Sequence, residues 1–488
     1  MGRIVLVSNR VMDLRQAPQA GGVAVALANM VRSGNALWFG WSGEISSEEE
    51  TEAVRRTGRI ATVPLTASDH QGYYLGYANS VLWPVLHNRL DLAQFEAGFF
   101  ERYVEVNRRL ARQLHALIRP DDTIWVHDYH LIPFAAELRK LGAENPIGFF
   151  LHVPFPPWQT FAAIPEHESL AHMIAAFDLI GLQTKADVAN LIDYLESGVY
   201  GRIVPDGRVR LFGRLLSVAS FPIGIDLETF ANAGRQSGLV QGRGPVNRII
   251  GIDRLDYTKG LPQKFKAFGR FLEKFPQYRR QVVLTQIAPP TRESVEAYSD
   301  IRHQLEMLAG SINGRHGELD WVPIHYIHRA TPRRRLPAIY RSARIGMVTP
   351  LRDGMNLVAK EYIASQDPDD PGALILSRFA GAAEELTDAL IVNPYNVEEM
   401  ANVIRTALEM SLEERRSRHA ALMEVLRRND VTAWSQSFLA RLERSRRTQD
   451  ALAPHTPEPI RQALERLKAA DAEPSSGPRP LRSEQPAA

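Results

Sequence analysis

Two cationic side chains lie in a short turn that follows an apolar run in the second half of the chain. The run covers residues 248–252, and the turn contains Arg254 and Lys259 before a helical pattern begins at Leu261. Two cations beside a helix start can neutralise a pyrophosphate and stabilise the charge that develops on a departing phosphate. An exposed Arg/Lys pair in a surface loop fits the pattern equally well.

A second turn of this kind follows the apolar run of residues 345–349. It contains Asp353 and Gly354, and the glycine is expected to adopt a positive φ in a tight turn. Backbone amides and Asp353 could then face a ligand, while the helix that starts at Leu357 directs its N-terminus at a phosphate. Glu361, one turn inside that helix, could bind ribose hydroxyls. Its carboxylate could equally serve only to interact favourably with the dipole of the helix near its N-terminus. Residues 377–381 repeat the strand–glycine–helix arrangement.

Polar residues also follow the apolar runs of the first half. Arg10 comes just after the first run, and Gly21-Gly22 precedes a helical pattern at residues 23–31. Paired glycines before a helix allow backbone amides to approach a phosphate, although a plain turn needs the same residues.

Two histidines flank an aspartate in His127-Asp128-Tyr129-His130, after another run. The side chains of His127 and His130 would leave the strand end in different directions, so we expect no metal site there. We also expect no other cofactor. Asp128 is better suited to accept hydrogen bonds from sugar hydroxyls. His152 follows a third run, before the prolines of residues 154–157 that stiffen its loop, and it could be structural or functional.

Apolar, β-branched runs alternate with helical patterns through most of the chain. Continuous hydrophobicity is expected of strands that are buried on both faces of a parallel sheet. We therefore predict an α/β fold of repeated βαβ units, with two Rossmann-like domains facing across a cleft. The expected strands are residues 4–7, 123–126, 147–151, 179–182, 248–252, 282–286, 345–349, 373–376 and 389–392, with helices at 95–117 and 261–275.

The polar, glycine-rich residues 232–245 interrupt this alternation. We place the domain boundary there, which gives two Rossmann-like domains at 1–240 and 241–450. Residues 451–488 are rich in proline and are expected to be a disordered tail, with one short helix at 460–470 at most.

The 488 residues carry a formal net charge of +2, which gives no reason to expect nucleic acid or a membrane surface as a partner. The absence of cysteine excludes disulfides and thiolate metal sites. No apolar run is long enough for a signal peptide or a membrane span, so we expect a cytoplasmic protein. We also expect small-molecule substrates and a homo-oligomer.

Taken together, several strings resemble the trehalose-6-phosphate synthases, retaining glycosyltransferases of family 20 with the GT-B fold. The resemblance runs from the first strand to about residue 445. The strings are VSNR at 7–10, LWFGWSG at 37–43, LWP at 82–84, HDYHL at 127–131, FLH at 150–152, RLDYTKG at 254–260, QIAP at 286–289 and TPLRDGMNLVAKE at 349–361.

The resemblance implies a role for each matching residue. The phosphate of glucose 6-phosphate is assigned to Arg10, Tyr74 and Arg292, and the rest of that site to Trp41, Trp83 and Asp128. The nucleotide-glucose is assigned to Gly21, Gly22, His152, Arg254, Lys259, Asp353, Gly354, Met355, Asn356, Leu357, Val358, Ala359, Lys360 and Glu361. The catalytic set is Asp128, His152, Arg254, Lys259 and Asp353. Residues 73–77 match the family only loosely, and the assignment of Tyr74 depends on them. Residues 327–331, which border the base in the family, match poorly, so the base of the nucleotide is left open.

The resemblance also implies front-face transfer of glucose from UDP-glucose or another nucleoside diphosphate glucose. No second carboxylate obviously partners Asp353, as a double displacement would require. The departing phosphate would instead take the acceptor proton, giving α,α-trehalose 6-phosphate. Two alternatives are transfer to another phosphorylated polyol, such as glycerol 3-phosphate, and a non-catalytic sugar-phosphate sensor.

Overall fold

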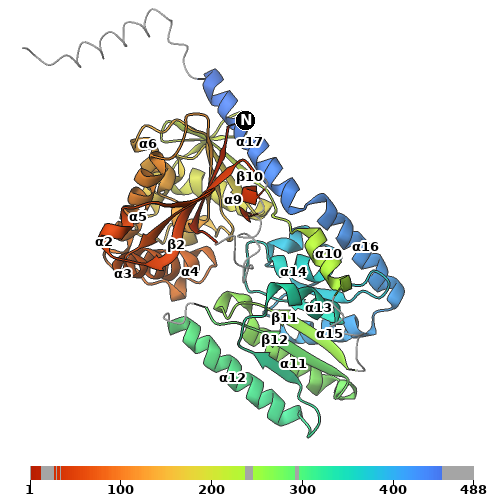
Figure 1. Ribbon diagram of the computed structural model, residues 1–488. Coiled ribbons are helices and arrows are strands. Elements are labelled where there is room, and N and C mark those ends of the chain that lie inside the picture. Colours follow the sequence, from red (N-terminus) through yellow and green to blue (C-terminus); the bar gives the residue numbers. More distant parts are fainter. Residues whose placement is uncertain are drawn as a thin grey trace, which may run out of the picture. The chain divides into compact units, whose positions relative to one another are not determined.

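The computed structural model describes residues 2–12, 27–28, 30–32, 34–236, 246–291 and 296–452. Residues up to Ser445 belong to one compact unit, and a second unit begins at Arg446, of which only the helix up to Leu452 is described. The first unit contains two separate sheets, and the elements built on each are called the first and the second half below (Figure 1).

The first sheet has ten strands in the order β3-β4-β2-β1-β5-β6-β7-β10-β9-β8. Its central strands are parallel, while β3 and the β8–β9–β10 meander add antiparallel edges. The bounds are β1 Ile4–Arg10, β2 Ala36–Ile45, β3 Arg55–Thr57, β4 Ile60–Leu65, β5 Thr123–His127, β6 Ile147–Phe150, β7 Leu179–Leu182, β8 Arg202–Ile203, β9 Val209–Leu211 and β10 Arg214–Ser220.

The second sheet has six strands, all parallel, in the order β13-β12-β11-β14-β15-β16. The order reverses between β11 and β14, which is where an open α/β sheet binds its ligand. The bounds are β11 Asn247–Ile252, β12 Val282–Ile287, β13 Ile324–Ile327, β14 Ile345–Val348, β15 Ala373–Ser377 and β16 Leu390–Val392.

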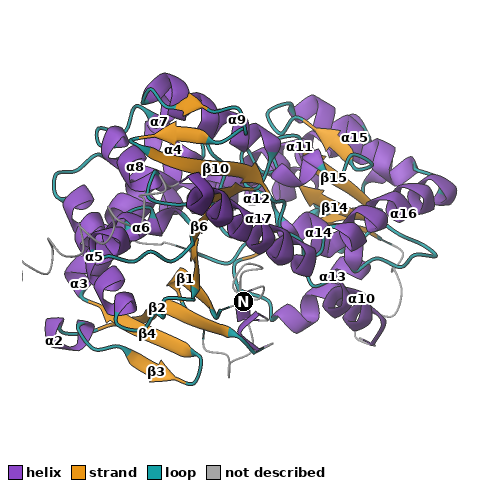
Figure 2. Cartoon of the chain, turned by 90° about the horizontal axis from the view of Figure 1, so that it is seen from above, coloured by secondary structure: helices purple, strands orange, loops and turns teal. Residues whose placement is uncertain are grey.

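Helices lie on both sides of the sheets (Figure 2). In the first half they are α2 Glu48–Thr51, α3 Ala67–Asp69, η1 His70–Leu82, α4 Trp83–Leu86, η2 Leu90–Leu92, α5 Phe99–His115, η3 Tyr129–Leu131, α6 Phe134–Lys140, α7 Trp158–Phe161, α8 His167–Ile174, α9 Lys185–Asp193, η4 Tyr194–Gly198 and α10 Leu227–Gln236. The others are η5 Tyr257–Lys259, α11 Leu261–Lys274, η6 Pro276–Tyr278, α12 Glu296–His316, η7 Arg333–Arg335, α13 Leu336–Arg341, α14 Leu357–Ala364, η8 Gly381–Glu384, α15 Val397–Glu409, α16 Leu412–Arg428 and α17 Val431–Leu452.

Each of the nine expected strands is confirmed, within two to three residues at either end. The expected helices at 95–117 and 261–275 correspond to α5 and α11. The expectations missed β2, β4, β13 and the antiparallel edges, because these segments contain glycine or polar residues that break a continuous apolar run. Most of the expected boundary segment and the expected helix at 460–470 lie outside the described residues.

Two helices pack on the opposite half from their neighbours in the sequence. Helix α10 packs on α13 and α14 of the second half. Helix α17 returns to the first sheet, where Phe438 fills the space above Gly148 and Gly181 so closely that a Cβ on either glycine would lie within 2.8 Å of its ring. Among the described residues, no helix is both long and apolar enough to cross a membrane.

Candidate active site

At the end of β1, Arg10 lies against the aromatic end of β2. Its guanidinium carbon is 5.9 Å from the centroid of the Trp41 ring. Gly43 adopts a φ of 89°, and a Cβ there would lie 2.8 Å from Arg10 Nε, so the backbone of β2 approaches the arginine closely. The exposed guanidinium of Arg10 therefore stands at the carboxyl edge of the first sheet, where a phosphate could reach it.

Tyr74 comes from η1, a π-helix of 13 residues. Such wide helices are rare and usually occur as single turns at functional sites. Two side chains stabilise the wide turns, since Asn79 Nδ2 donates to the carbonyl of Tyr74 at 2.7 Å and Ser80 Oγ donates to that of Leu75 at 2.8 Å. The Tyr74 ring lies 5.6 Å from that of Trp41.

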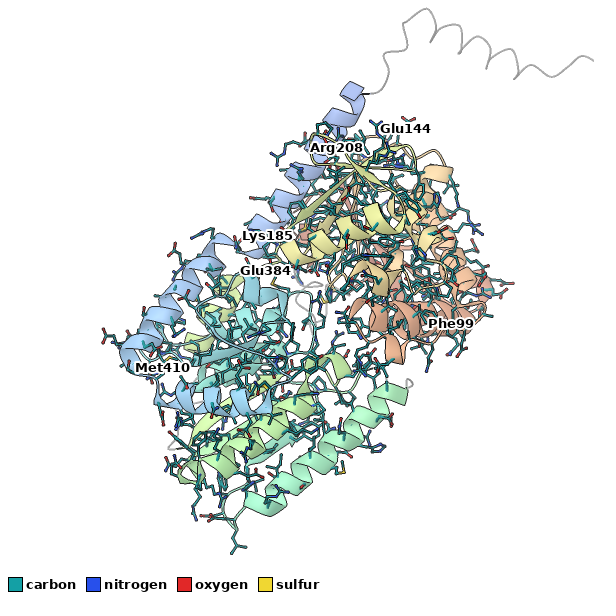
Figure 3. The ribbon with its side chains drawn as sticks, turned by 180° about the vertical axis from the view of Figure 1, so that it is seen from behind. Phe99, Glu144, Lys185, Arg208, Glu384 and Met410 are labelled. Carbon is teal, nitrogen blue, oxygen red and sulfur yellow. The ribbon has the colours of Figure 1, made fainter. Side chains whose placement is uncertain are left out.

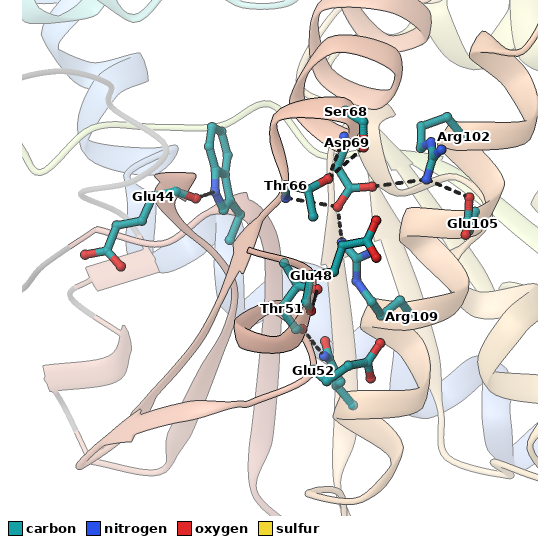
Figure 4. Close-up of polar contacts among 12 residues, drawn as sticks. Glu44, Glu48, Thr51, Glu52, Thr66, Ser68, Asp69, Arg102, Glu105 and Arg109 are labelled. Carbon is teal, nitrogen blue, oxygen red and sulfur yellow. Dashed lines mark hydrogen bonds and ion pairs between the residues drawn. The ribbon is translucent and has the colours of Figure 1, made fainter. Parts of the chain in front are cut away.

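A buried carboxylate anchors the start of η1 (Figure 4). Asp69 caps its own turn by accepting a hydrogen bond from Thr66 N at 3.1 Å, and Arg109 of α5 binds the same oxygen. Arg102 approaches the other oxygen at 3.6 Å. Because burying a carboxylate is favourable only when it is paired, this cluster fixes where the π-helix begins.

A line of ring contacts joins the predicted acceptor residues to the second half. Tyr74 stacks on His130 at 5.8 Å, His130 contacts Tyr129 at 4.0 Å, and Tyr129 contacts Trp83 at 5.8 Å. The guanidinium carbon of Arg254 lies 5.6 Å from the Trp83 ring. Arg10 and Arg254 are therefore the two ends of one continuous series of contacts.

Asp128 has a φ of 75°, a backbone conformation that few residues other than glycine adopt. It accepts a hydrogen bond from the backbone N–H of His152 at 3.2 Å. The structure thus brings two predicted catalytic residues into direct contact at the carboxyl ends of β5 and β6.

The His152 ring also pairs with that of His127, with 3.1 Å between His152 Nε2 and His127 Nδ1. Burial lowers the pKa of His152 to about 3. Burial, together with the neighbouring His152, holds the pKa of His127 well below its usual range. Trp434 of α17 lies 6.0 Å from the His152 ring. Both imidazoles are therefore neutral near pH 7, and α17 completes their apolar surroundings.

In the second half, Lys259 and Asp353 form an ion pair. Lys259 Nζ lies 2.5 Å from Asp353 Oδ2, which also accepts a hydrogen bond from Asn356 Nδ2 at 3.0 Å. Lys259 ends η5 just before Gly260, whose φ is 64° and whose Cβ position is occupied by the carbonyl of Thr349. The two predicted turns are thus packed on each other, and glycine is required at that contact.

The expectation of a positive φ at Gly354 is wrong. The positive φ of this turn belongs to Asn356, at 74°, whose side chain tolerates that conformation. Gly354 is instead required by close approach, because a Cβ would lie 2.1 Å from the carbonyl oxygen of His152. A Cβ on Gly381 would in turn lie 1.8 Å from the carbonyl oxygen of Gly354.

The residues after this turn differ in where their side chains lie. Met355 and Ala359 are buried in the core, while Leu357 and Val358 are half-buried at the start of α14. Lys360 is directed away from Asp353, because its Nζ donates to the carbonyl of Ile223 at 2.8 Å and pairs with Glu385 at 2.6 Å.

Glu361 is buried and already has two partners. Tyr340 donates a hydrogen bond to it at 3.2 Å, and Arg333 lies 3.4 Å from its other oxygen. Burial raises the pKa of Glu361, while the charge of Arg333 and the Tyr340 hydrogen bond oppose that shift. Tyr340 and Arg333 thus fix the orientation of the carboxylate.

Close polar contacts hold the two halves together next to this site. Glu384 accepts hydrogen bonds from the backbone N–H groups of Lys185 and Ala186, at 3.1 and 3.3 Å, and so caps the start of α9 (Figure 3). Arg352 lies 3.5 Å from the buried Asp187. These contacts come from residues that flank the predicted donor turns.

The residues that sequence reasoning missed are those that contact and orient the predicted site residues. His127 was considered only as a metal ligand, and Arg333, Arg89 and Trp434 were not singled out. Their partners lie far away in the sequence, so no local spacing could reveal them. Gly21, Gly22 and Arg292 lie outside the described residues, and their predicted roles stay predictions.

Comparison with known proteins agrees with this geometry. The sequence profile of glycosyltransferase family 20 matches residues 6–444. The chain belongs to glycosyltransferase family 20. A trehalose-6-phosphate synthase of Enterobacter sp. (strain 638) is 46% identical over 456 residues, which are 91% of this chain and 96% of the relative.

Two solved structures of the family are also similar to this chain. A UDP-forming α,α-trehalose-phosphate synthase from Burkholderia xenovorans, in complex with glucose-6-phosphate, is 46% identical with a TM-score of 0.87, covering 91% of this chain and 100% of that one. An E. coli structure bound with UDP-2-fluoro glucose is 45% identical with a TM-score of 0.86, covering 90% and 99%. The expected α/β fold of two Rossmann-like sheets, the GT-B fold, is confirmed.

Proposed function

We propose that this chain is a retaining glucosyltransferase that moves glucose from UDP-glucose to glucose 6-phosphate, releasing UDP and α,α-trehalose 6-phosphate. The observation that carries the proposal is the near-complete coverage of the chain by family 20 synthases at 45–46% identity. The series of ring contacts between Arg10 and Arg254 supports it, because it links a cation for the acceptor phosphate to a cation for the donor diphosphate.

In the proposed reaction, Arg254 and Lys259 neutralise the diphosphate of the donor, and Arg10 binds the phosphate of the acceptor. The bond between the glucose C1 and the β-phosphate oxygen breaks while the acceptor hydroxyl bonds to C1 on the same face. The departing phosphate oxygen takes the hydroxyl proton. The protein then acts by positioning two sugars and stabilising charge on the leaving group. The engagement of Asp353 with Lys259 and Asn356 suits a binding role better than that of a nucleophile.

The product identifies the reaction. The purified chain is incubated with glucose 6-phosphate and, in parallel, UDP-glucose or GDP-glucose, and the product is identified by mass spectrometry and by digestion with trehalose-specific enzymes. Trehalose 6-phosphate is expected with UDP-glucose. Turnover with glycerol 3-phosphate in place of glucose 6-phosphate, or tight binding with no turnover, would contradict the proposal.

We also propose a cytoplasmic location, a homo-oligomeric state and the boundary between domains 1–240 and 241–450. Light scattering after size-exclusion chromatography measures the oligomeric state, and a single-chain mass would contradict it. Cell fractionation tests the location, and separate expression of the two segments tests the boundary.

A further inference from the structure

Two arginine–aromatic contacts join the two halves in opposite directions. Arg254 of the second half lies 5.6 Å from the centroid of the Trp83 ring, and Arg89 of the first half lies 5.5 Å from the centroid of the Tyr257 ring. Each half thus contributes one cation and one ring. We call these four residues the arginine clasp. Neither Arg89 nor Tyr257 was assigned a role by the sequence pattern.

The first-half side of the clasp is a rigid segment. His87 is buried after α4, and its Nδ1 lies 2.8 Å from the carbonyl of Trp83. Asn88 adopts a φ of 58°, which turns the chain back so that Arg89 N donates to the carbonyl of Pro84 at 2.8 Å. Arg89 is held further by a bidentate pair with Asp91, at 2.9 and 2.8 Å. Trp83 and Arg89 therefore keep a fixed spacing.

The second-half side is equally constrained. Asp256 Oδ1 accepts hydrogen bonds from Thr258 N and Thr258 Oγ1, both at 2.9 Å. Tyr298 donates to the other oxygen of Asp256 at 3.2 Å, and its ring packs on Tyr257 at 5.3 Å. These bonds tie the Tyr257 ring to the turn that ends in Lys259.

The same turn is tied to Asp353. Leu351 N donates to the carbonyl of Thr258 at 2.7 Å, and Lys259 Nζ binds Asp353 Oδ2. Tyr257 is therefore connected to the ion pair at the predicted donor site through its neighbours Thr258 and Lys259. Arg89 contacts the Tyr257 ring of this turn. It belongs to the same segment as Trp83, a predicted acceptor residue.

We propose that Arg89 and Tyr257 are positioning residues that couple the binding of the two substrates, an inference that rests on the proposed function. The clasp fixes Trp83 and Lys259 relative to each other, so a ligand bound beside either residue favours the arrangement that the other ligand also needs. Two ligands that favour the same arrangement of a protein strengthen each other's binding. Arginine–aromatic attraction increases as water is excluded, so a filled site reinforces the clasp.

The test is the dissociation constant of UDP, measured by isothermal titration calorimetry with and without saturating glucose 6-phosphate. For the wild-type chain, we expect glucose 6-phosphate to tighten UDP binding by about 5-fold or more. Arg89→Met and Tyr257→Leu should each bring this ratio close to one. The double variant should lose no more than either single variant, because both remove one contact.

Two further variants separate coupling from general damage. Arg405→Met removes another arginine–aromatic contact, with Phe275 at 4.9 Å, and should keep the wild-type ratio. Arg89→Lys retains a cation and should recover part of the coupling. An unchanged ratio in Arg89→Met, or an equal loss in Arg405→Met, would overturn the clasp. A wild-type chain that binds neither UDP nor glucose 6-phosphate would instead refute the proposed function.

Discussion

Lys259 Nζ lies 2.5 Å from Asp353 Oδ2, so the predicted donor cation and the predicted donor carboxylate are in direct contact. Both side chains are largely buried, at 10% and 15% exposure. The ammonium group is thus already oriented, and the ordering cost of placing a cation against a diphosphate is met by the fold.

Replacing Lys259 with alanine should lower kcat by about two to three orders of magnitude, because one preorganised charge at a leaving group contributes about 2.7–4 kcal/mol to transition-state stabilisation. Steady-state kinetics with UDP-glucose and glucose 6-phosphate measure the effect, and circular dichroism checks the fold. Lys274→Ala is the control, since its partner Glu398 is exposed and lies 3.2 Å away. A Lys259→Ala chain with a near-normal rate would remove this residue from the mechanism.

Gly354→Ala should strongly impair turnover. The new Cβ would lie 2.1 Å from the carbonyl oxygen of His152, and a backbone atom cannot move aside cheaply. A displacement of about 1 Å between catalytic groups can lower the rate about 100-fold. Gly310→Ala in α12 is the matched control, because nothing lies within 4 Å of its Cβ position, and it should stabilise the chain by about 0.5–1 kcal/mol. Equal activity of the two variants would show that the contact with His152 is not needed.

Lys360→Met should destabilise the fold and leave the KM for UDP-glucose unaltered. Its side chain is fully buried and pairs with Glu385, so removing the cation leaves a buried carboxylate without its main partner. Breaking such a pair costs about 3–5 kcal/mol, which lowers the midpoint of thermal unfolding. Adding Glu385→Gln should restore much of the loss. A raised KM with unchanged thermal stability would favour a direct role at the donor instead.

Acid should destabilise the chain partly through His87. Burial lowers the pKa of His87 to about 4. Below pH 6.5 the unfolded chain binds a proton there that the folded chain does not accept until about pH 4. The free energy of unfolding contributed by this residue is therefore complete above pH 6.5 and decreases as the pH falls, by up to about 1.4 kcal/mol per pH unit.

In His87→Asn the amide can still donate to the carbonyl of Trp83 but cannot take up a proton. Urea unfolding between pH 4 and 7 should therefore show a shallower decline for this variant. The same substitution at the exposed His115 is the control. Parallel curves for wild type and His87→Asn would mean that other groups determine the acid sensitivity.

The sequence alone determined the buried parallel strands and the turns that follow them. A strand covered on both faces must be apolar throughout, and this local property identified every strand of the second sheet except β13, which lies at its edge. Parallel strands also end at one edge, so Arg254 and Asp353 could be placed together without coordinates. The strings that resemble family 20 can likewise be recognised from residues that are neighbours in the sequence.

Only the tertiary structure decided which side chains of those turns face each other and which face the interior. Gly354 is required by a carbonyl in the opposite half, Lys360 is directed at Glu385, and Arg89 meets Tyr257. These facts depend on contacts between residues that are distant in the sequence and on close packing, neither of which leaves a periodic signal in the chain. Local pattern therefore located the site, while long-range packing determined its geometry.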